Sequence, residues 1–321
     1  MTLLGCSGAP RWYQGDEGQL DRYIALLKQS GATAIEVVLH HGPADDRTAR
    51  VHLLRQDWDR VLGAYRRAEL AVQVHVSLDP RFATSRWLSE PEALRAEYKP
   101  ILAVVGALAV EQGRVVLIAH GSGDSRLSES ENREATVGLL GWLAEETAST
   151  SGRADIALEL RAAVDGRPAV GRTRASLLDL VQEVDSPRVG ICWDLAHDFE
   201  NSRHEAGWTV VPDDAFLDRV VHVHAHDIDD LWEPHYPLVL GRVPVAKQLA
   251  ALARRPAGLP SITMEVRWRC AERLGQPWDL LARSFESIEG ILTGIEADDL
   301  AANELKIVPY VPGAEPRRSQ G

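Results

Sequence analysis

Short apolar runs alternate with longer stretches of helical period along this chain. The apolar runs, of five or six residues, predict eight strands: Leu3–Ser7, Ala34–Leu39, Ala71–Val76, Val115–His120, Asp155–Leu160, Val189–Asp194, Val220–His224 and Ser261–Val266. The longer stretches between and after them predict eight helices: Gln19–Ser30, Leu54–Glu69, Pro91–Gln112, Glu131–Ser149, Thr173–Val184, Pro212–Asp218, Val243–Arg254 and Pro277–Ile295. Eight strands and eight helices in this alternation predict an α/β protein, a single (β/α)8 TIM barrel.

No segment of the chain reads as a linker that would divide this alternation into two domains. We therefore assign residues 1–297 to the barrel and residues 298–321 to a short irregular C-terminal tail. The tail is polar and rich in proline, so we expect it to be flexible or to pack across the outside of the barrel. An open doubly wound sheet is the alternative architecture, because local patterns do not prove that a sheet closes. The glycine-rich turn that is typical of that fold after the first strand is missing here.

Four predicted strands in the second half of the chain each end in a side chain that can bind a hard cation. These residues are Glu159, Asp194, His224 and Glu265. Because the C-terminal ends of the strands meet at one mouth of a barrel, we expect the four side chains to surround a divalent metal ion. Side chains alternate along a strand, so the inward neighbours of Asp194 and Glu159 are Cys192 and Ala157. These small residues leave room for the ion.

Further acidic and imidazole side chains lie near the same predicted mouth. Glu36, His75 and His120 end or nearly end earlier strands, and the loops after the sixth and seventh strands carry His197, His226, Glu233 and His235. In Asp194-Leu195-Ala196-His197 the spacing lets the histidine reach the same ion, a second ion or the substrate. For Glu36 and His75, a substrate contact and a polar plug inside the barrel are equally good interpretations. His222, one layer lower, is expected to form hydrogen bonds rather than to bind metal.

The composition of the chain fits a soluble enzyme with a full core. It has 321 residues, of which 45% are hydrophobic, and a formal net charge of −12 that disfavours a broad nucleic-acid-binding surface. Its three cysteines are far apart and form no Cys-x-x-Cys motif, so neither a disulfide framework nor a zinc ribbon is expected. The N-terminus lacks a basic segment followed by a long apolar one, and no later window could span a membrane. We therefore expect a cytoplasmic protein with no membrane segment.

The order of the motifs along the chain carries a family resemblance. The motifs are a Gly-rich turn before Glu36, His75 on the third strand, Ala119-His120-Gly121 on the fourth, Leu158-Glu159 on the fifth, the Gly-x-x-x-Asp-x-x-His of Gly190 to His197 on the sixth, and Glu265 on the eighth. From Leu3 to Ile295 they resemble the xylose-isomerase-like TIM barrel superfamily, which contains sugar phosphate isomerases and epimerases and endonuclease IV. The seventh strand departs from the pattern, because it reads His224-Ala225-His226-Asp227 where His-x-Lys-Asp is usual.

The resemblance implies a metal-dependent isomerase or epimerase of a sugar, or of a sugar-like polyol or hydroxyketone. One divalent ion would be held by the four strand-end residues, and three oxygen donors with one imidazole suit Mn²⁺, Mg²⁺ or Co²⁺. Glu159 and Glu265 would act as base and acid in a proton transfer through a metal-stabilised enediolate. The residues that would contact the substrate are His197, Arg267, His75, His120, Glu36 and His226. The same ligands serve dehydration of a keto-polyol, so a dehydratase is an alternative.

The main rival function uses more metal. In an endonuclease IV-like phosphoesterase a multinuclear Zn²⁺ site would draw on further candidate ligands, which here are His75, His120, His197, Glu233 and His235. The acidic net charge counts against this reading, as does Leu158-Glu159-Leu160-Arg161, which lacks the Glu-Asn pair of the nuclease branch. A barrel that keeps its ligands without catalysis is a third alternative. The expected partner is a small sugar or polyol rather than nucleic acid, and barrels of this group suggest a homodimer.

Overall fold

Nine strands are present in the computed structural model, which describes residues 2–7, 17–40, 52–54, 58–149, 152–162 and 170–296. The predicted tail, residues 298–321, lies outside these ranges. Eight strands match the sequence prediction: β1 (Leu4–Cys6), β2 (Ala34–His40), β4 (Ala71–His75), β5 (Arg114–Ala119), β6 (Arg153–Glu159), β7 (Val189–Asp194), β8 (Val220–Ala225) and β9 (Ser261–Met264). The ninth, β3 (His52–Leu54), pairs with the C-terminal end of β2 and was not predicted.

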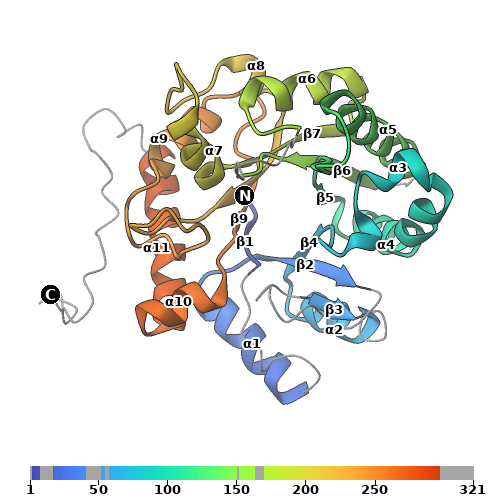
Figure 1. Cartoon of the computed structure of the whole chain (residues 1–321). Coiled ribbons are helices and arrows are strands. Elements are labelled where there is room, and N and C mark those ends of the chain that lie inside the picture. The colour runs from blue at the N-terminus through green and yellow to red at the C-terminus, as the bar shows by residue number, and fades with distance from the viewer. Residues whose placement is uncertain are drawn as a thin grey trace, which may run out of the picture.

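The eight predicted strands form a nearly closed parallel barrel (Figure 1). Neighbouring strands pair in the order β1-β9-β8-β7-β6-β5-β4-β2. At the remaining junction, between β1 and β2, the backbone N–H of Thr33 donates to the carbonyl of Leu4 at 2.9 Å. The backbone N–H of Leu4 in turn donates to the Thr33 hydroxyl at 2.9 Å. The fold is therefore the predicted (β/α)8 TIM barrel, with β3 paired to the C-terminal end of β2 on the edge opposite β4.

Helices cover the outside of the barrel (Figure 1). They are α1 (Glu17–Gln29), α2 (Trp58–Arg67), η3 (Pro80–Phe82), α3 (Arg86–Ser89), α4 (Pro91–Gln112), α5 (Glu129–Ala148), α6 (Arg174–Val184), α7 (Leu195–Asn201), η4 (Ser202–His204), α8 (Asp214–Leu217), α9 (Val245–Ala253), α10 (Trp268–Leu274) and α11 (Pro277–Glu296). Eight of them correspond to the predicted helices, whereas α3, α7, α10 and the two 3₁₀ turns were not predicted. Within the described part of the chain, no helix is long and apolar enough to cross a membrane.

The alternation of side chains along the strands separates two apolar layers. On β6 and β7, Leu158 and Trp193 face outward and pack into the large core between the barrel and its helices. Ala157 and Cys192 face inward, where they join Val116 and Ile118 of β5. This arrangement confirms the predicted parity of both strands. It also places Glu159 and Asp194, two residues beyond these small inward side chains, at the C-terminal end of the barrel.

Capping residues explain where some helices begin. Ser128 forms a capping box with Glu131, so α5 begins at Glu129, two residues before the predicted start. Thr173 caps α6 in the same way, through Ser176. The helix predicted from Leu54 begins only at Trp58, because Leu54 belongs to β3.

Candidate active site

Four buried side chains converge at the C-terminal end of the barrel. Glu159 ends β6, Asp194 ends β7, His224 lies one residue before the end of β8, and Glu265 directly follows β9. Each is at most 3% exposed. Nδ1 of His224 lies 3.2 Å from Oε2 of Glu265, and 3.9 Å from both Oε1 of Glu159 and Oδ2 of Asp194. The structure thus gathers the predicted quartet around one imidazole.

A chain of hydrogen bonds beneath the quartet fixes which nitrogen of His224 carries a proton. The Ser261 hydroxyl lies 2.7 Å from Nδ1 of His222. The Nε2 atoms of His222 and His224 lie 3.3 and 3.0 Å from the same oxygen, Oε2 of Glu36. Because a carboxylate only accepts hydrogen bonds, both imidazoles donate from Nε2. A neutral His224 therefore has its lone pair on Nδ1, which faces the carboxylates of the quartet.

The quartet has the properties expected of a site for a divalent cation. Nδ1 of His224 makes no hydrogen bond within the described residues, although Oε2 of Glu265 lies only 3.2 Å away. A lone pair facing a carboxylate at this distance needs a positive charge, either a proton on the ring or a cation between the two groups. Burial lowers the pKa of His224, but the Glu36 carboxylate, 3.0 Å from its Nε2, outweighs burial and raises that pKa well above its usual value. A proton and a cation would therefore compete for Nδ1.

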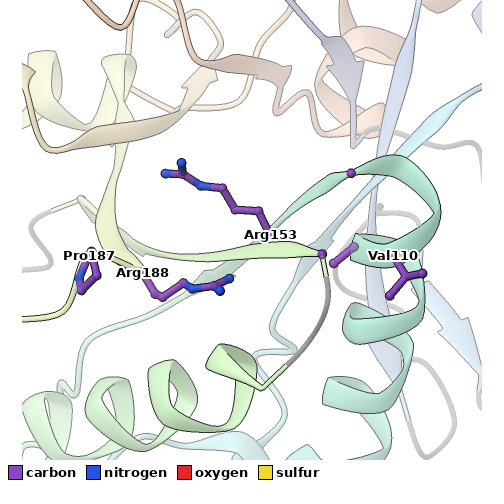
Figure 2. Close-up of a pocket in the computed structure, with 7 residues that line it drawn as sticks. Val110, Arg153, Pro187 and Arg188 are labelled. Carbon is purple, nitrogen blue, oxygen red and sulfur yellow. The ribbon is translucent and has the colours of Figure 1, made fainter.

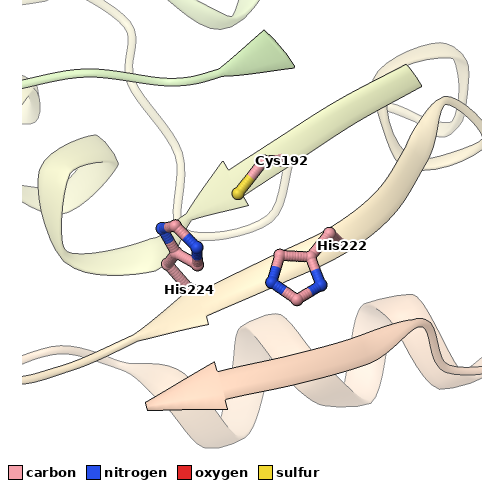
Figure 3. Close-up of side chains that lie close together, drawn as sticks. All are labelled: Cys192, His222 and His224. Atoms are coloured by element: carbon pink, nitrogen blue, oxygen red, sulfur yellow. The ribbon is translucent and has the colours of Figure 1, made fainter. Parts of the chain in front are cut away.

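Cys192 lies on β7 beside the two histidines of β8 (Figure 3). Its sulfur and one nitrogen from each of His222 and His224 lie within 4.8 Å of one another. Burial raises the pKa of the Cys192 thiol to about 12, so the thiol is neutral. Both Nε2 atoms already donate to Glu36. We therefore interpret Cys192 as a small interior side chain rather than as a metal ligand.

Glu36 does not lie at the mouth of the barrel, where the sequence analysis placed it. β2 continues for four residues beyond it, to His40, so the side chain lies one layer lower and is only 1% exposed. Burial would raise the pKa of Glu36, but His224 and His222 hold that pKa well below its usual value. Of the two interpretations of Glu36, this position favours the polar plug inside the barrel over the substrate contact, and the carboxylate orients His224 from below.

Leucine in place of Glu36 should destabilise the fold by roughly 2–4 kcal/mol, because two buried imidazole N–H groups would lose their acceptor. Glutamine at the same position is the matched control. Its amide oxygen can still accept both hydrogen bonds, so the loss should be less than half as large. Urea denaturation of the two variants without added metal measures the difference. Equal losses would contradict the hydrogen-bond chain described above.

Two more histidines lie close to one carboxylate oxygen of Glu159, Oε2. Nε2 of His120 lies 2.7 Å, and Nε2 of His75 lies 3.3 Å, from Oε2 of Glu159. Nδ1 of His75 is 2.8 Å from the carbonyl of Val76, to which it can only donate, so Nε2 of a neutral His75 also presents a lone pair to a carboxylate. Burial would raise the pKa of Glu159, but His120, whose Nε2 lies 2.7 Å from Oε2, outweighs burial and holds that pKa well below its usual value. The structure thus brings these two predicted ligands to the quartet.

The two carboxylate oxygens of Asp194 have different partners. One caps a helix and the other faces the histidines of the site. Oδ1 accepts the backbone N–H groups of Ala196 at 3.0 Å and His197 at 2.8 Å, and so caps α7. Oδ2 lies 3.0 Å from Nδ1 of His197 and 3.1 Å from Nε2 of His226. Burial opposes ionisation, but His197 and His226 lower the pKa of Asp194 below its usual value. The Asp-x-x-His spacing therefore works because a helix starts where the strand ends and turns His197 back to the carboxylate.

The helix that carries His197 is anchored by a buried ion pair that the sequence analysis missed. Asp198 on α7 accepts hydrogen bonds from the guanidinium of Arg174 at 2.9 and 3.0 Å. It also accepts the indole N–H groups of Trp193 at 2.9 Å and Trp208 at 3.1 Å. Trp193 and Trp208 lie within ten residues of Asp198 in the chain, whereas Arg174 comes from the start of α6. The ion pair fixes α7 and with it the direction of His197.

The loop after β8 brings His235 to the site but turns Glu233 away. Nδ1 of His235 lies 3.6 Å from Oε2 of Glu265. The carboxylate of Glu233 instead pairs with Arg273 at 2.5 Å, so it does not join the histidines as predicted. Arg267 is half-buried at the start of α10, and its backbone N–H donates to the carbonyl of His235 at 3.0 Å. The predicted multinuclear set is therefore incomplete on this side of the barrel.

Asp227 ties the two ends of the loop between β8 and α9 together by accepting five backbone hydrogen bonds. Its Oδ1 accepts from Ile228, Arg242 and Val243 at 3.1, 3.1 and 3.2 Å. Its Oδ2 accepts from Leu240 and Gly241 at 2.9 and 2.7 Å. Its position directly after the strand-seven motif suggests a residue that orients His226 or His197, but the carboxylate instead binds these backbone N–H groups.

Asparagine in place of Asp227 should destabilise the protein by roughly 2–4 kcal/mol, because an amide NH₂ would face two buried backbone donors. Asp229→Asn is the matched control in the same loop. Oδ1 of Asp229 accepts the N–H groups of Leu231 and Glu233, both at 2.8 Å, and asparagine keeps that oxygen. Its cost should stay below about 1 kcal/mol. Guanidinium denaturation of both variants tests the difference, and similar losses would show that the five bonds to Asp227 are not special.

A hollow of about 630 Å³ lies at the opposite end of the barrel (Figure 2). It is lined by Ala109, Val110, Gly113, Gly152, Arg153, Pro187 and Arg188. Arg153 begins β6 and Glu159 ends it, so six residues of strand, or about 20 Å, separate the hollow from the quartet. The Arg153 guanidinium bonds to Asp155 at 2.9 Å. This hollow is no part of the candidate site.

The chain matches the family model of the xylose isomerase-like TIM barrel over residues 24–289. It therefore belongs to this family. The structure is similar to a D-tagatose 3-epimerase-like protein, with a TM-score of 0.65 and 17% identity over 93% of this chain and 100% of that one. It is also similar to L-ribulose 3-epimerase (TM-score 0.63, 17% identity, 95% and 99% covered) and to 3-keto-D-glucoside 4-epimerase from E. coli (0.61, 16%, 91% and 99%). At these identities the likeness shows a shared fold. Among curated proteins, no sequence is significantly similar to this chain.

Proposed function

We propose that the protein is a divalent-metal-dependent epimerase that inverts a carbon next to the carbonyl of a ketose or a keto-sugar. The observation that carries this proposal is the position of Glu159 and Glu265, whose oxygens lie within 4.8 Å of each other and of His224. The names of the similar structures support the choice of reaction. A ketose 3-epimerase acts beside a carbonyl at C2 and a 3-keto-glucoside 4-epimerase acts beside a carbonyl at C3. Both must remove a proton from a carbon next to a carbonyl.

The ion would be held by the quartet of Glu159, Asp194, His224 and Glu265. Every pair of these residues has ligand atoms within 4.8 Å, and all four are buried. Three carboxylates and one imidazole suit Mn²⁺, Mg²⁺ or Co²⁺. Such an ion would supply the positive charge that stabilises negative charge developing on the substrate oxygens.

The two glutamates approach the site from different sides of the barrel mouth. β7 and β8 lie between β6, which carries Glu159, and β9, which Glu265 follows. One carboxylate would take the proton from the carbon next to the carbonyl, and the other would return a proton to the opposite face. The low pKa of Glu159 keeps it ionised at neutral pH, which a base requires. His197 and His235, beside these carboxylates, would hold substrate oxygens.

A second ion beside the first is the alternative that one observation favours. His75 and His120 both point their Nε2 atoms at Oε2 of Glu159, at 3.3 and 2.7 Å, and His75 has a lone pair on that nitrogen. Such a pair of ions would suit hydrolysis of a phosphoester. A further ion on the His235 side of the barrel would need the carboxylate of Glu233 as a ligand. That carboxylate is not available, because it pairs with Arg273.

Incubation of the Mn²⁺-loaded protein with a panel of ketoses and 3-keto-glycosides tests the proposal. We expect one product per active substrate, with a single inverted centre next to the carbonyl, identified by chromatography and NMR. An aldose product would indicate an isomerase instead, and loss of water would indicate a dehydratase. Cleavage of a phosphodiester substrate, with no change in any sugar, would overturn the proposal in favour of the multinuclear alternative.

A further inference from the structure

Both ring nitrogens of His226 are engaged in a way that leaves one position for its proton. Nδ1 accepts the backbone N–H of His235 at 2.9 Å, and Nε2 lies 3.1 Å from Oδ2 of Asp194. A backbone N–H can only donate, so Nδ1 carries a lone pair and Nε2 carries the proton. The carbonyl of Asp227, 3.2 Å from Nδ1, already accepts the N–H of Tyr236 at 3.0 Å. His226 is therefore a neutral ring that donates to Asp194.

The conformation of the loop after β8 directs the backbone N–H of His235 at Nδ1 of His226. Asp227 and Tyr236 form an antiparallel bridge that closes the loop. His235, just before Tyr236, adopts a left-handed backbone conformation with φ of 69°, which is strained for a residue other than glycine. In this conformation its N–H is directed at His226. The surrounding contacts hold a strained residue in place, and one result is a fixed tautomer of His226.

With this hydrogen bond, every rotation of the Asp194 carboxylate is opposed. Two backbone N–H groups at the start of α7 hold Oδ1, at 2.8 and 3.0 Å, and His226 holds Oδ2. His226 is completely buried, so water does not compete for this bond. Because both its nitrogens are used, His226 has no lone pair for an ion, although it lies within reach of His197 and His235. It also cannot contact a substrate in the way the sequence analysis expected.

We propose that His226 is a positioning residue, which fixes Oδ2 of Asp194 for the divalent ion and is itself oriented by the backbone N–H of His235. The inference rests on the proposed function in one respect, namely that Asp194 is a ligand of the ion. Residues that orient metal ligands in this way typically contribute about 10- to 100-fold to metal affinity. The effect of His226 should therefore appear in metal binding, before any substrate is added.

Two substitutions separate the two hydrogen bonds of His226. In His226→Gln the amide nitrogen reaches the position of Nε2 and can still donate to Asp194. In His226→Asn the amide oxygen takes the position of Nδ1 and can still accept from His235, but the side chain is too short to reach Asp194. Titration calorimetry with MnCl₂ on metal-free protein should give a dissociation constant for the glutamine variant within about threefold of wild type. The asparagine variant should bind about 10- to 100-fold more weakly.

Melting temperatures of the metal-free variants show whether either one is simply misfolded. We expect both to melt within a few degrees of wild type, and the asparagine variant to gain less on addition of Mn²⁺. The inference is wrong if both variants bind Mn²⁺ as wild type does, or if glutamine weakens binding as much as asparagine. Wild-type protein that binds no divalent ion would instead contradict the proposed function itself. The two failures are therefore distinguishable.

Discussion

Glutamine in place of Glu265 should leave a folded protein that turns over its substrate roughly 10²–10⁴-fold more slowly than wild type. Glutamine has nearly the same size as glutamate and can still offer an oxygen to an ion, but it cannot take up or return a proton. The side chain is 1% exposed and lies 3.2 Å from His224, so no water can readily replace it as the base. Steady-state rates at saturating Mn²⁺, with circular dichroism to check the fold, measure the effect.

Asp194→Asn is the control for this variant. It also removes one negative charge from the quartet and, with its amide oxygen capping α7, turns an NH₂ towards the ion, so it weakens metal binding without removing a group that is assigned to the proton transfer. Saturating Mn²⁺ should therefore restore most of the turnover of the asparagine variant, while the Glu265 variant stays slow. Near-normal turnover by Glu265→Gln would remove this residue from the proton transfer. Equal rates for the two variants would reduce Glu265 to a metal ligand.

Removal of divalent metal should abolish turnover and lower the melting temperature by about 5–10 °C. An ion that binds only the folded state stabilises it by about 2.7 kcal/mol at a concentration 100 times its dissociation constant. A change of 1 kcal/mol shifts the melting temperature of a domain near this size by about 2–4 °C. Chelation followed by readdition of Mn²⁺, monitored by both activity and thermal unfolding, tests this expectation.

The dependence of this effect on pH provides an internal check. The pKa of His224 lies well above its usual value in the metal-free protein, so binding at its Nδ1 must release a proton. Affinity for Mn²⁺ should therefore rise as the pH is raised, until His224 is deprotonated without the ion.

Bound metal, counted by plasma mass spectrometry, should be about one ion per chain, or two if His75 and His120 bind one as well. A melting temperature unaffected by Mn²⁺ at every pH would show that the quartet holds no ion.

Strand periodicity accounts for the parts of the site that the sequence alone located. The side chains of Ala157 and Cys192 face inward, as alternation requires, and this rule carries Glu159 and Asp194 to the mouth. Because parallel strands share one direction, their ends meet wherever the barrel closes. The eight strands could be predicted for the same reason, since each is a local apolar run. The short β3 gave no comparable signal.

Other parts of the site depend on contacts that no local pattern contains. Glu36 lies below the mouth because β2 runs on to His40, and only the folded barrel places it beside His224. Glu233 was expected at the metal site, but two residues of its loop, Trp232 and His235, adopt left-handed conformations and the carboxylate pairs with Arg273. That direction is set by the loop as a whole, not by residue spacing.

The fate of the proton next to the carbonyl shows whether Glu159 and Glu265 transfer protons to and from the substrate. A ketose that the protein accepts should be epimerised in D₂O with Mn²⁺, and the product examined by proton NMR. We expect one deuterium at the inverted carbon and none elsewhere, with incorporation lost in Glu265→Gln. Product that forms in D₂O at a normal rate but carries no deuterium at that carbon would contradict a proton transfer between Glu159, Glu265 and the substrate.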